Sequence, residues 1–500
     1  MREAGCEWDT AAPWLILQHG SADLVRRCRD AGLLELVCEM AWCVAGLGHL
    51  EMLQYMVGTG CPFDRKLCRD VARGARGAAV FAASARGMAT ADLASLNPRD
   101  AVIVSAARTP LGAFQGSLSA LTATQLGGVA IRAAVARAGV RPEDVQEVLF
   151  GNVCSANLGQ APASQAAAEG GLPHSVPATT INKVCASGMK AAIFAAQSIL
   201  AGDADLIVAG GMESMSGVPY YMPALRGGAR LGHVQAVDGL VKDGLWDPGT
   251  DAHMGACAEL CAERFQITRE DMDRHAISAF ERARAAALAG HTDAEVVPVE
   301  VPSGRRGGAP VVVTRDEALT KIDVEKLRGL RPFFKQDGGS ITAGNSSPLS
   351  DGACALVIAS AEHARRDGLP ALAVVRGYGD ANQQPEWFTT APAAAIPKAL
   401  ARAGLRQEQV DYWEVNQAFS VVDLVNQKIL GLDPARVNAH GGAVALGHPL
   451  GATGAVIISR LISVLRAHGA RVGCAAICNG GGGASAIVIE ALRQQQGSHI

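Results

Sequence analysis

Cys185 has the surroundings of a reactive thiol. It lies in the segment INKVCASGMK (181–190), at the junction of a predicted strand and a predicted helix. Because backbone N–H groups at the start of a helix favour negative charge, we expect this thiol to titrate at a lower pH than an ordinary cysteine and to be a better nucleophile. The small residues that follow it leave room for an acyl group beside the backbone. Taken alone, an isolated cysteine is more often a buried structural residue.

Two glycine-rich segments supply the partners that such a nucleophile needs. The segment HGGAVALGHPLG (440–451) places His448 on a tightly turned loop, and CAAICNGGGG (474–483) places Cys478 at the end of an apolar strand. Either segment alone is typical of an ordinary turn. A cysteine, a histidine and a second cysteine, each beside small residues at a turn or strand end, are much harder to explain by packing. Together they favour nucleophilic catalysis.

Two cysteine pairs with four-residue spacing, Cys257/Cys261 and Cys474/Cys478, are the candidates for zinc ligands. Neither pair has a second Cys or His pair at finger-like spacing, so we predict no metal site. The 13 cysteines are odd in number, and the N-terminal region lacks a basic stretch followed by an apolar one. We therefore expect reduced thiols in an intracellular compartment.

Alternating strands and helices must position these residues, and they begin near Asp100. Short apolar runs rich in β-branched residues predict strands, and longer segments with helical spacing predict helices. The predicted strands cover 101–105, 145–153, 179–184, 205–209, 373–375 and 410–414, and the predicted helices cover 122–138, 186–201, 392–403 and 421–430. This rhythm predicts an α/β fold of two halves, with a largely parallel sheet covered on both faces. A segment richer in charge, glycine and proline, about 217–335, is predicted to cover a site.

Composition excludes several classes of protein. The 500 residues are 49% hydrophobic and 19% charged, which is ample for a large buried core. The 45 Lys and Arg residues nearly balance the 48 Asp and Glu residues, so the net charge of −3 gives no global basic field for nucleic acid or anionic lipid. No run reaches the roughly 18 uncharged apolar residues of a membrane span. We therefore expect a soluble protein with neither nucleic acid nor a membrane as partner.

The N-terminal region differs from the rest of the chain. Residues 1–70 hold three tryptophans and six cysteines and are predicted to form short helices, and GHLEMLQY (48–55) resembles the start of the inner helix of an ankyrin repeat. The full ankyrin turn signature is missing, so we interpret 1–70 as a degenerate ankyrin-like fragment. Residues 71–98, rich in Ala, Arg, Gly and Ser, are predicted to be a linker.

The blocks around Cys185, His448 and Cys478 resemble the signatures of the thiolase family, in the order that this family uses. Further matching phrases are SAARTP (105–110), GGMESMS (210–216), TAGNSSPLSDGA (342–353) and CNGGGGASA (478–486). The resemblance runs from about Asp100 to about Leu492. It implies a thiolase-like five-layered αβαβα sandwich of two similar halves, 99–365 and 370–492, with a loop domain inserted in the first half.

The resemblance implies a role for each of five residues. Cys185 would accept an acyl group as a thioester, and His448 would take its proton and later hold a thioester oxygen. Cys478 would be the general base that removes a proton alpha to the carbonyl of a second thioester. Asn416 would position a water that completes an oxyanion site with His448. The backbone amides of Cys185 and Gly480 would form a second oxyanion site, and such donors are typically worth about 10²–10³ in rate.

The substrate class also follows from the resemblance. The segment DAHMG (251–255) and the phrase WFTTAPAAAIPKAL (387–400) resemble the short-chain, biosynthetic members of the family. The implied reaction is the reversible Claisen condensation of two acetyl-CoA molecules to acetoacetyl-CoA and CoA, with CoA thioesters as substrates and no permanently bound cofactor. The implied coenzyme A contacts are Leu245, His253, Met254, Ala343, Ser347, Ala418 and Phe419. A degradative 3-ketoacyl-CoA thiolase, a 3-ketoacyl synthase and an inactive thiolase-like scaffold are the alternatives.

Four positions depart from the usual family pattern. Gln417 replaces a glutamate, Ser164 an arginine, Thr453 a serine and Val456 an arginine. None of these changes removes a reacting group, but the loss of a buried charge at Gln417 could alter how Asn416 is held.

Oligomer and compartment are expected from weaker signals. The resemblance implies a homotetramer, built as a dimer of dimers. The C-terminal SHI tripeptide differs from the peroxisomal S-K-L signal at two of three positions, and the Arg- and Ala-rich stretch 71–95 has transit-peptide composition but is internal. We expect a cytoplasmic protein, with peroxisome and mitochondrion as alternatives.

Overall fold

The computed structural model describes residues 92–304, 308–320 and 323–492. Backbone contacts divide the chain into two units, 1–89 and 90–500, and the described residues belong to the second. The predicted ankyrin-like fragment and most of the predicted linker lie outside the described residues. The last part of that linker packs on the fold, because Leu93 and Leu96 are buried in its core and Arg365 donates hydrogen bonds to both of their carbonyl oxygens.

Ten strands form one mixed sheet, in the order β14-β15-β16-β13-β1-β12-β5-β3-β4 with β2 beside β12. Their bounds are β1 (Ala101–Arg108), β2 (Gly112–Ala113), β3 (Glu147–Gly151), β4 (Ala178–Ile181), β5 (Leu206–Ser214), β12 (Ser350–Ser360), β13 (Ala373–Asn382), β14 (Tyr412–Val415), β15 (Val472–Asn479) and β16 (Gly483–Ala491). The two halves of the sheet meet at the short pairing of β1 with β13, where Val102 faces Val374. The strands predicted from the sequence are all present.

The prediction of a largely parallel sheet is wrong. Only β3 with β4, β3 with β5, and β14 with β15 pair in parallel, and the remaining neighbours in this sheet are antiparallel. One antiparallel pair has a local cause, and the pairing of β12 with β5 bridges a long stretch of sequence. The tight turn between β15 and β16 forces those strands to run in opposite directions, and β12 returns beside β5 only after the long insertion.

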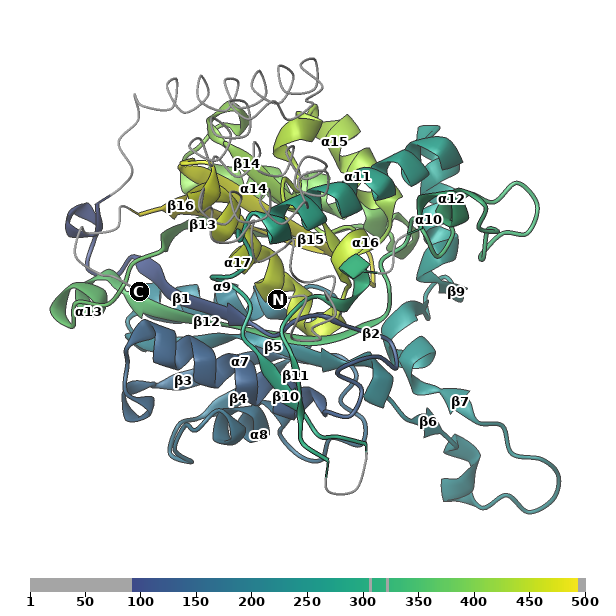
Figure 1. The fold of residues 1–500 in the computed structure, drawn as a ribbon, viewed down its shortest axis with the longest axis horizontal. Helices are drawn as coiled ribbons and strands as arrows, with labels where there is room; N and C mark the ends of the chain where they lie inside the picture. Colours follow the sequence, from purple (N-terminus) through teal and green to yellow (C-terminus); the bar gives the residue numbers. More distant parts are fainter. Residues whose placement is uncertain (1–91, 305–307, 321–322, 493–500) are drawn as a thin grey trace, which may run out of the picture. The chain divides into compact units, whose positions relative to one another are not determined.

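Helices cover both faces of each half of the sheet, so the predicted five-layered sandwich is confirmed (Figure 1). The helices α7 (Ala123–Ala138) and α8 (Pro162–Glu169) cover one outer face, α9 (Ser187–Ala201) and α17 (Leu450–Ala467) fill the middle, and α14 (Ala391–Ala403) covers the other outer face. Successive strand residues point to opposite faces, so Val102 belongs to the outer core and Ile103 to the central one.

The central layer depends on residues without side chains. A Cβ atom on Gly188, in the first turn of α9, would lie 2.9 Å from the carbonyl oxygen of Gly451, in the first turn of α17. A Cβ atom on Gly454 would collide with the backbone nitrogen of Met189. Because glycine occupies these positions, the first turns of the two helices are in direct contact.

Two helical segments, Val184–Ala201 and Leu450–Ala467, are long and apolar enough to cross a membrane by length and composition. Of these segments, 56% and 83% respectively are buried inside the protein. Packing in the layer between the two half-sheets therefore accounts for their hydrophobicity.

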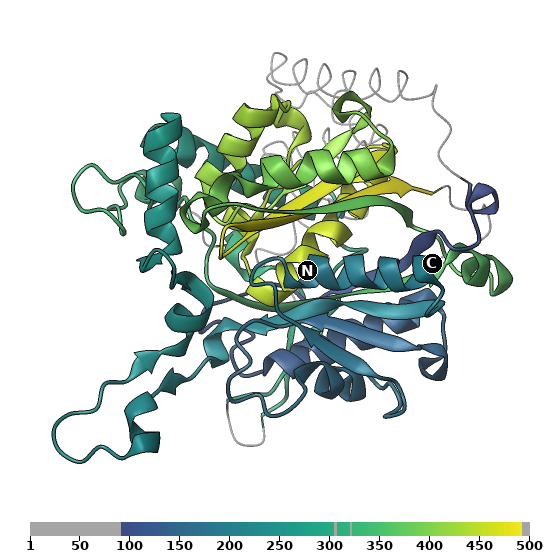
Figure 2. The same cartoon turned by 180° about the vertical axis from the view of Figure 1, so that it is seen from behind.

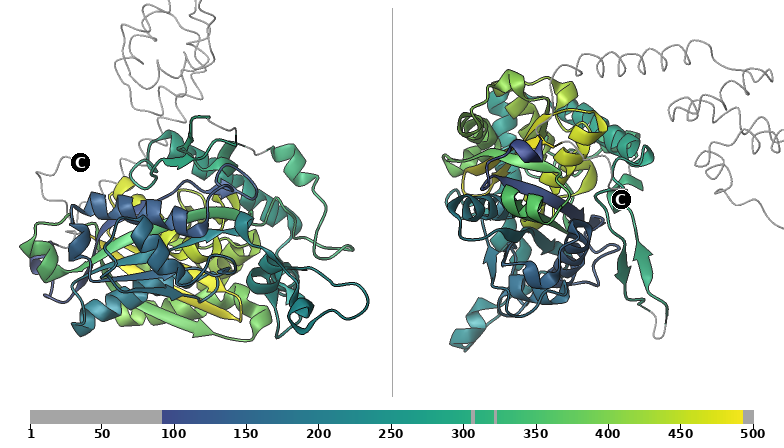
Figure 3. Two further views of the ribbon diagram at one scale, coloured as in Figure 1. Left: turned by 90° about the horizontal axis from the view of Figure 1, so that it is seen from below. Right: turned by 90° about the vertical axis from the view of Figure 1, so that its left-hand side faces the viewer.

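Between β5 and β12 the chain leaves the sheet and forms the insertion. Its elements are β6 (Tyr220–Tyr221), β7 (Val237–Asp238), β8 (Trp246–Asp247), β9 (Ala252–His253), α10 (Met254–Phe265), α11 (Arg269–Leu288), β10 (Val299–Val301), β11 (Val311–Val313) and α12 (Val324–Arg328). The arm that carries β6 and β7 projects from the body (Figure 2), and the hairpin of β10 and β11 projects separately from it (Figure 3). The helices α10 and α11 pack against α15 (Ser420–Leu430), and α11 also packs against α16 (Ala443–Leu446).

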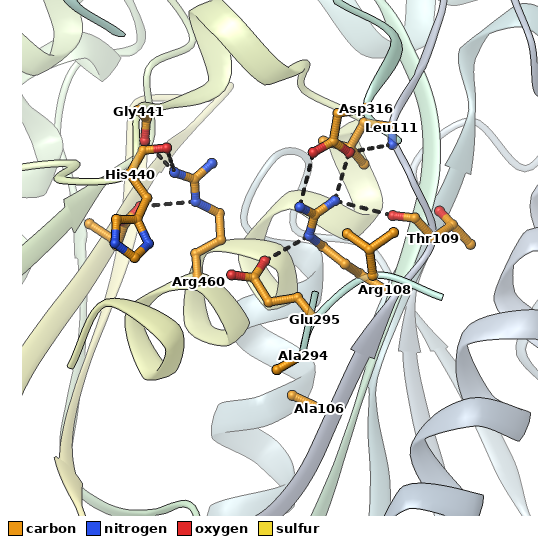
Figure 4. Close-up of polar contacts among 12 residues, drawn as sticks. Ala106, Arg108, Thr109, Leu111, Ala294, Glu295, Asp316, His440, Gly441 and Arg460 are labelled. Atoms are coloured by element: carbon orange, nitrogen blue, oxygen red, sulfur yellow. Dashed lines mark hydrogen bonds and ion pairs between the residues drawn. The ribbon is translucent and has the colours of Figure 1, made fainter. Parts of the chain in front are cut away.

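A buried ion cluster fastens the insertion to the first strand (Figure 4). Arg108, at the end of β1, is fully buried and donates to Glu295 at 2.8 Å and to both oxygens of Asp316 at 2.7 and 3.0 Å. Burial alone would lower the pKa of the guanidinium, but the charges of Asp316 and Glu295 raise it above its ordinary value. The backbone N–H of Leu111 donates to the same Asp316 carboxylate. One arginine therefore holds the chain on both sides of the hairpin formed by β10 and β11.

We predict that Arg108→Met destabilises the fold strongly, because it removes the cation that pairs with the two buried carboxylates of Glu295 and Asp316. Breaking a buried ion pair on one side typically costs about 3–5 kcal/mol. Thermal and urea unfolding of the two proteins would measure the loss. The matched control is Arg141→Met, because Arg141 pairs with Asp144 at the surface and this change should leave unfolding nearly unaltered. Equal unfolding curves for the two variants would contradict a stabilising role for the cluster.

Candidate active site

Cys185 lies on a sharp turn between β4 and α9. Val184, just before it, has a φ of 47°, a left-handed backbone conformation that is strained for a β-branched residue. Ser187 holds this turn closed, because its hydroxyl donates to the Val184 carbonyl at 2.6 Å and accepts from the Lys183 N–H at 2.8 Å. The turn therefore presents the Cys185 side chain at the entrance to α9.

The thiol of Cys185 is neutral at physiological pH, so the predicted low pKa is wrong. Burial raises the pKa of this thiol to about 11, and the nearby charge of Glu213 adds to the increase. The backbone N–H groups of Gly480 and of Cys185 itself point at the sulfur and lower the pKa, but they do not outweigh the loss of water. A nucleophile with this pKa needs a base to remove its proton.

His448 is a neutral imidazole with a defined tautomer. Its Nδ1 lies 2.7 Å from the hydroxyl of Thr453, and that hydroxyl donates to the Pro449 carbonyl at 2.8 Å. The hydroxyl proton is thus already used, so Nδ1 must be the donor and Nε2 keeps a free lone pair. Burial lowers the pKa of His448 to about 4. The departure at Thr453 therefore preserves a hydroxyl that orients the His448 ring.

The buried side chain of Arg460 holds the loop before His448 in place (Figure 4). Arg460, in α17, donates to the carbonyl oxygens of His440 and Gly441 and lies 3.6 Å from the carboxylate of Glu414. Burial raises the pKa of Glu414 to about 8, and Arg460 only partly opposes this. The glycine-rich loop is therefore fixed to the same helix whose first turn touches α9.

Asn416 follows β14 and faces the histidine. Its Nδ2 lies 3.5 Å from Nε2 of His448, and its backbone N–H donates to the Ala476 carbonyl at 2.9 Å. The Asn416 Oδ1 is buried and has no hydrogen-bond partner among the described residues. An amide with a free acceptor beside a neutral imidazole is an arrangement that can bind a polar group, such as a water or a carbonyl.

Cys478 lies at the end of β15, directly before the glycine turn, and is buried. Burial, and secondarily the proximity of Cys185, raise the pKa of its thiol well above the ordinary value. A Cβ atom on Gly480 would lie 3.5 Å from Val184 and 3.7 Å from the sulfur of Met254. The turns that carry the two cysteines are therefore neighbours, and Met254 lies against the turn that follows Cys478.

His253 and Phe419 belong to one aromatic group. The ring of His253 stacks on Phe334 with centroids 4.7 Å apart, and Phe334 meets Phe419 edge-on at 6.3 Å. The backbone N–H of Gly255 donates to Nδ1 of His253, which caps α10. Burial lowers the pKa of His253 below its ordinary value. Phe334 was not predicted from the sequence, because no motif surrounds it.

The remaining predicted coenzyme A contacts lie around these elements. The Ser347 N–H and hydroxyl both donate to the Ala418 carbonyl, at 3.0 and 2.9 Å, and this joins their two loops. Leu245 packs in the same apolar cluster as Cys185, whereas Ala343 is exposed on the loop that leads to Ser347. The structure thus brings the predicted residues to one region, with Ala343 at its edge.

Glu213 is a further buried residue beside this region. Its carboxylate accepts from the backbone N–H groups of Val153, Cys154 and Gly451 at 2.9–3.1 Å and from the Asn152 side chain at 2.9 Å. Burial raises the pKa of Glu213 to about 7, against the effect of these donors. Glu213 lies in the phrase GGMESMS. A single carboxylate among small residues was the sequence signal that could have identified it as a buried polar residue. Among the described residues no group of three or more His, Cys, Asp or Glu is arranged to hold a metal ion.

We predict that Cys185 reacts slowly with iodoacetamide at pH 7 and about tenfold faster per pH unit up to pH 10, since only the thiolate is nucleophilic. Because the pKa is raised to about 11, the thiolate fraction of Cys185 still increases with pH at values at which an ordinary thiol is already fully ionised. Peptide mass spectrometry would identify the labelled residue, with Cys185→Ser as the control. A labelling rate that is constant above pH 8 would contradict the neutral thiol.

Comparison with known families gives two matches. The family model "Thiolase, N-terminal domain" matches residues 101–362, and "Thiolase, C-terminal domain" matches residues 369–491. Acetyl-CoA acetyltransferase 2 of Arabidopsis thaliana is 60% identical over 398 residues, covering 80% of this chain and 98% of the relative. The cytosolic acetyl-CoA acetyltransferase ERG10 of Gibberella zeae is 54% identical over 391 residues, covering 78% and 98%.

Solved structures agree with this. The Acat5 thiolase from Ascaris suum, crystallised with coenzyme A, has a TM-score of 0.74 and 44% identity, covering 79% of this chain and all of that one. The Bacillus anthracis acetyl-CoA acetyltransferase has a TM-score of 0.76 and 39% identity, covering 79% and 99%. The two family models together match most of the chain, and the relatives are up to 60% identical to it. The chain therefore belongs to the thiolase family.

Proposed function

We propose that this chain is an acetyl-CoA acetyltransferase that condenses two acetyl-CoA molecules reversibly to acetoacetyl-CoA and CoA. The observation that carries the proposal is that a thiol with two backbone N–H groups aimed at its sulfur lies near a second buried thiol, and that the helices beginning just after Cys185 and just after His448 touch at their first turns. The relatives' names support the choice of acetyl-CoA as the substrate. CoA thioesters are the substrates, and no resident cofactor is required.

In the first half-reaction Cys185 becomes acetylated. Nε2 of His448 takes the thiol proton while the sulfur attacks the carbonyl carbon of acetyl-CoA. The N–H groups of Cys185 and Gly480, which point at the sulfur in the free protein, donate to the oxygen of the tetrahedral intermediate. The departing CoA thiolate takes a proton from the neutral thiol of Cys478. The products are CoA, acetylated Cys185, an imidazolium at His448 and a thiolate at Cys478.

The second half-reaction uses the two charges left by the first. The Cys478 thiolate, strongly basic because its pKa is raised, removes a proton from the alpha carbon of a second acetyl-CoA. The His448 imidazolium and a water held by Asn416 stabilise the enolate oxygen. The enolate carbon attacks the acetyl group, the Cys185 sulfur leaves, and it recovers its proton from His448. Acetoacetyl-CoA is released, and all three residues return to their starting protonation states.

The pocket residues favour short acyl groups. Met254 lies against the turn that follows Cys478, and Leu245 packs in the cluster that contains Cys185. These side chains occupy the space that a longer acyl chain would need. The aromatic group of His253, Phe334 and Phe419 would contact the pantetheine arm. A degradative thiolase acting on long 3-ketoacyl-CoA is the alternative that the same catalytic residues would serve.

Assembly and compartment are proposed with the function. We infer a homotetramer, because the projecting arm exposes the apolar side chains Tyr220, Met222, Leu225 and Leu231, which association would cover. A cytoplasmic location is supported by the relative that is named cytosolic. The C-terminal SHI tripeptide lies outside the described residues.

We predict efficient thiolysis of acetoacetyl-CoA by CoA and slow thiolysis of a long-chain 3-ketoacyl-CoA, because Met254 and Leu245 restrict the acyl pocket. The loss of absorbance of the 3-ketoacyl thioester would be followed for chains of four to sixteen carbons. Similar kcat/KM values across the series would identify a degradative thiolase. No thiolysis of any of them would identify an inactive scaffold.

We predict that two variants fail at different steps. Cys478→Ala should still be acetylated at Cys185, because the His448 imidazolium or solvent can protonate the departing CoA in place of Cys478, but it should neither condense a second acetyl-CoA nor exchange the alpha protons of acetyl-CoA with deuterium. The loss should be about 10²–10⁴, the range of a general base. His448→Ala should slow acetylation itself, because the thiol loses its base. Labelled acetyl-CoA and NMR would separate the steps, and normal condensation by Cys478→Ala would assign the base elsewhere.

A further inference from the structure

A single buried carboxylate collects four hydrogen bonds behind the active-site loop. Asp423 is 1% exposed, and its Oδ2 accepts from Nε2 of His275 at 2.9 Å, Nε2 of Gln417 at 2.8 Å and Nδ2 of Asn438 at 2.7 Å. Its Oδ1 accepts from Nε2 of Gln427 at 2.7 Å. Although burial alone would raise it, the hydrogen bonds from His275, Gln417 and Gln427 lower the pKa of Asp423 below its ordinary value. The residue is therefore an anion.

The position of Asp423 suits an anion for a second reason. It lies in the first turn of α15, where the free backbone N–H groups of the helix favour negative charge. His275 comes from α11 of the insertion, and Gln427 from the next turn of α15. The carboxylate thus joins three separate parts of the chain.

Asn416 is held between two of these donors. Gln417, its neighbour on one side, donates directly to Asp423. Val415, its neighbour on the other side, exchanges two hydrogen bonds with the Asn438 side chain, at 3.0 and 2.9 Å, and the same side chain donates to Asp423. The residues before and after Asn416 are therefore both tied to one carboxylate. The angle at which Asn416 meets His448 depends on that anchor.

We propose that Asp423 is the positioning residue for Asn416, and that it supplies the negative charge behind this loop that the glutamine at position 417 lacks. Gln417 fits because its amide donates to the carboxylate. A glutamate at 417 would place two carboxylates in direct contact while Asp423 is present, and like charges at that distance repel strongly. The charge can therefore occupy position 417 or position 423, but not both.

The test moves the negative charge between positions 417 and 423. It rests on the proposed function, because the readout is acetyltransferase activity. Asp423→Ala should lower kcat for condensation by about 10- to 100-fold, since a misplaced catalytic group costs up to about 10² in rate. Gln417→Glu alone should lower it similarly. The double variant Gln417→Glu with Asp423→Ala should recover to within about threefold of wild type, because it again holds one carboxylate.

A second readout separates positioning from general destabilisation. Asn416 acts on the enolate, so Asp423→Ala should slow condensation while Cys185 acetylation and the KM for acetyl-CoA stay near their wild-type values. The matched control is Ile396→Ala, which leaves a cavity under α14 in the outer layer. It should destabilise the fold without changing the ratio of the condensation rate to the acetylation rate.

Two results would overturn the proposal. One is equal slowing of acetylation and condensation by Asp423→Ala, and the other is a double variant less active than either single variant. Should Asp423→Ala not fold, Gln417→Glu and the double variant still decide the question. A wild-type protein without thiolysis activity would instead refute the proposed function.

Discussion

The close contact between α9 and α17 is the constraint on which the site depends. Cys185 stands just before the first helix and His448 just before the second, so the two side chains can meet only if the first turns of these helices touch. Glycine at positions 188 and 454 allows this approach, because any side chain there would collide with the backbone of the opposite helix. The two half-sheets, packed on either side of this pair, then fix where the remaining loops arrive.

The same burial that brings the groups together also sets their protonation. Burial raises the pKa values of the Cys185 and Cys478 thiols and lowers the pKa of the His448 imidazole, so all three groups are neutral. A neutral set carries no unpaired charge in a region of low dielectric, which keeps the free protein stable. In the proposed mechanism, catalysis consists of moving protons among these groups, and fixed N–H groups and amides stabilise the charges that form.

Much of the architecture could be predicted from local patterns. The strands and helices near residues 101, 186, 392 and 421 begin within a few residues of the predicted positions, because apolar period and length are local properties. Strand direction was predicted wrongly, because it depends on which strands become neighbours after a long insertion. The low pKa expected for Cys185 failed for a related reason. A helix start is visible in sequence, whereas the amount of water around a sulfur is not.

The sequence by itself determined the chemical inventory: the thiol, imidazole and second thiol, the glycines beside them and the family whose pattern they match. Only the tertiary structure decided how each group is held. Thr453 fixes the tautomer of His448, and Asp423 accepts from Gln417 and Asn438 on either side of it and from His275 in the distant insertion. Such contacts join residues from different elements, and no local pattern encodes them, because each exists only once the layers have packed.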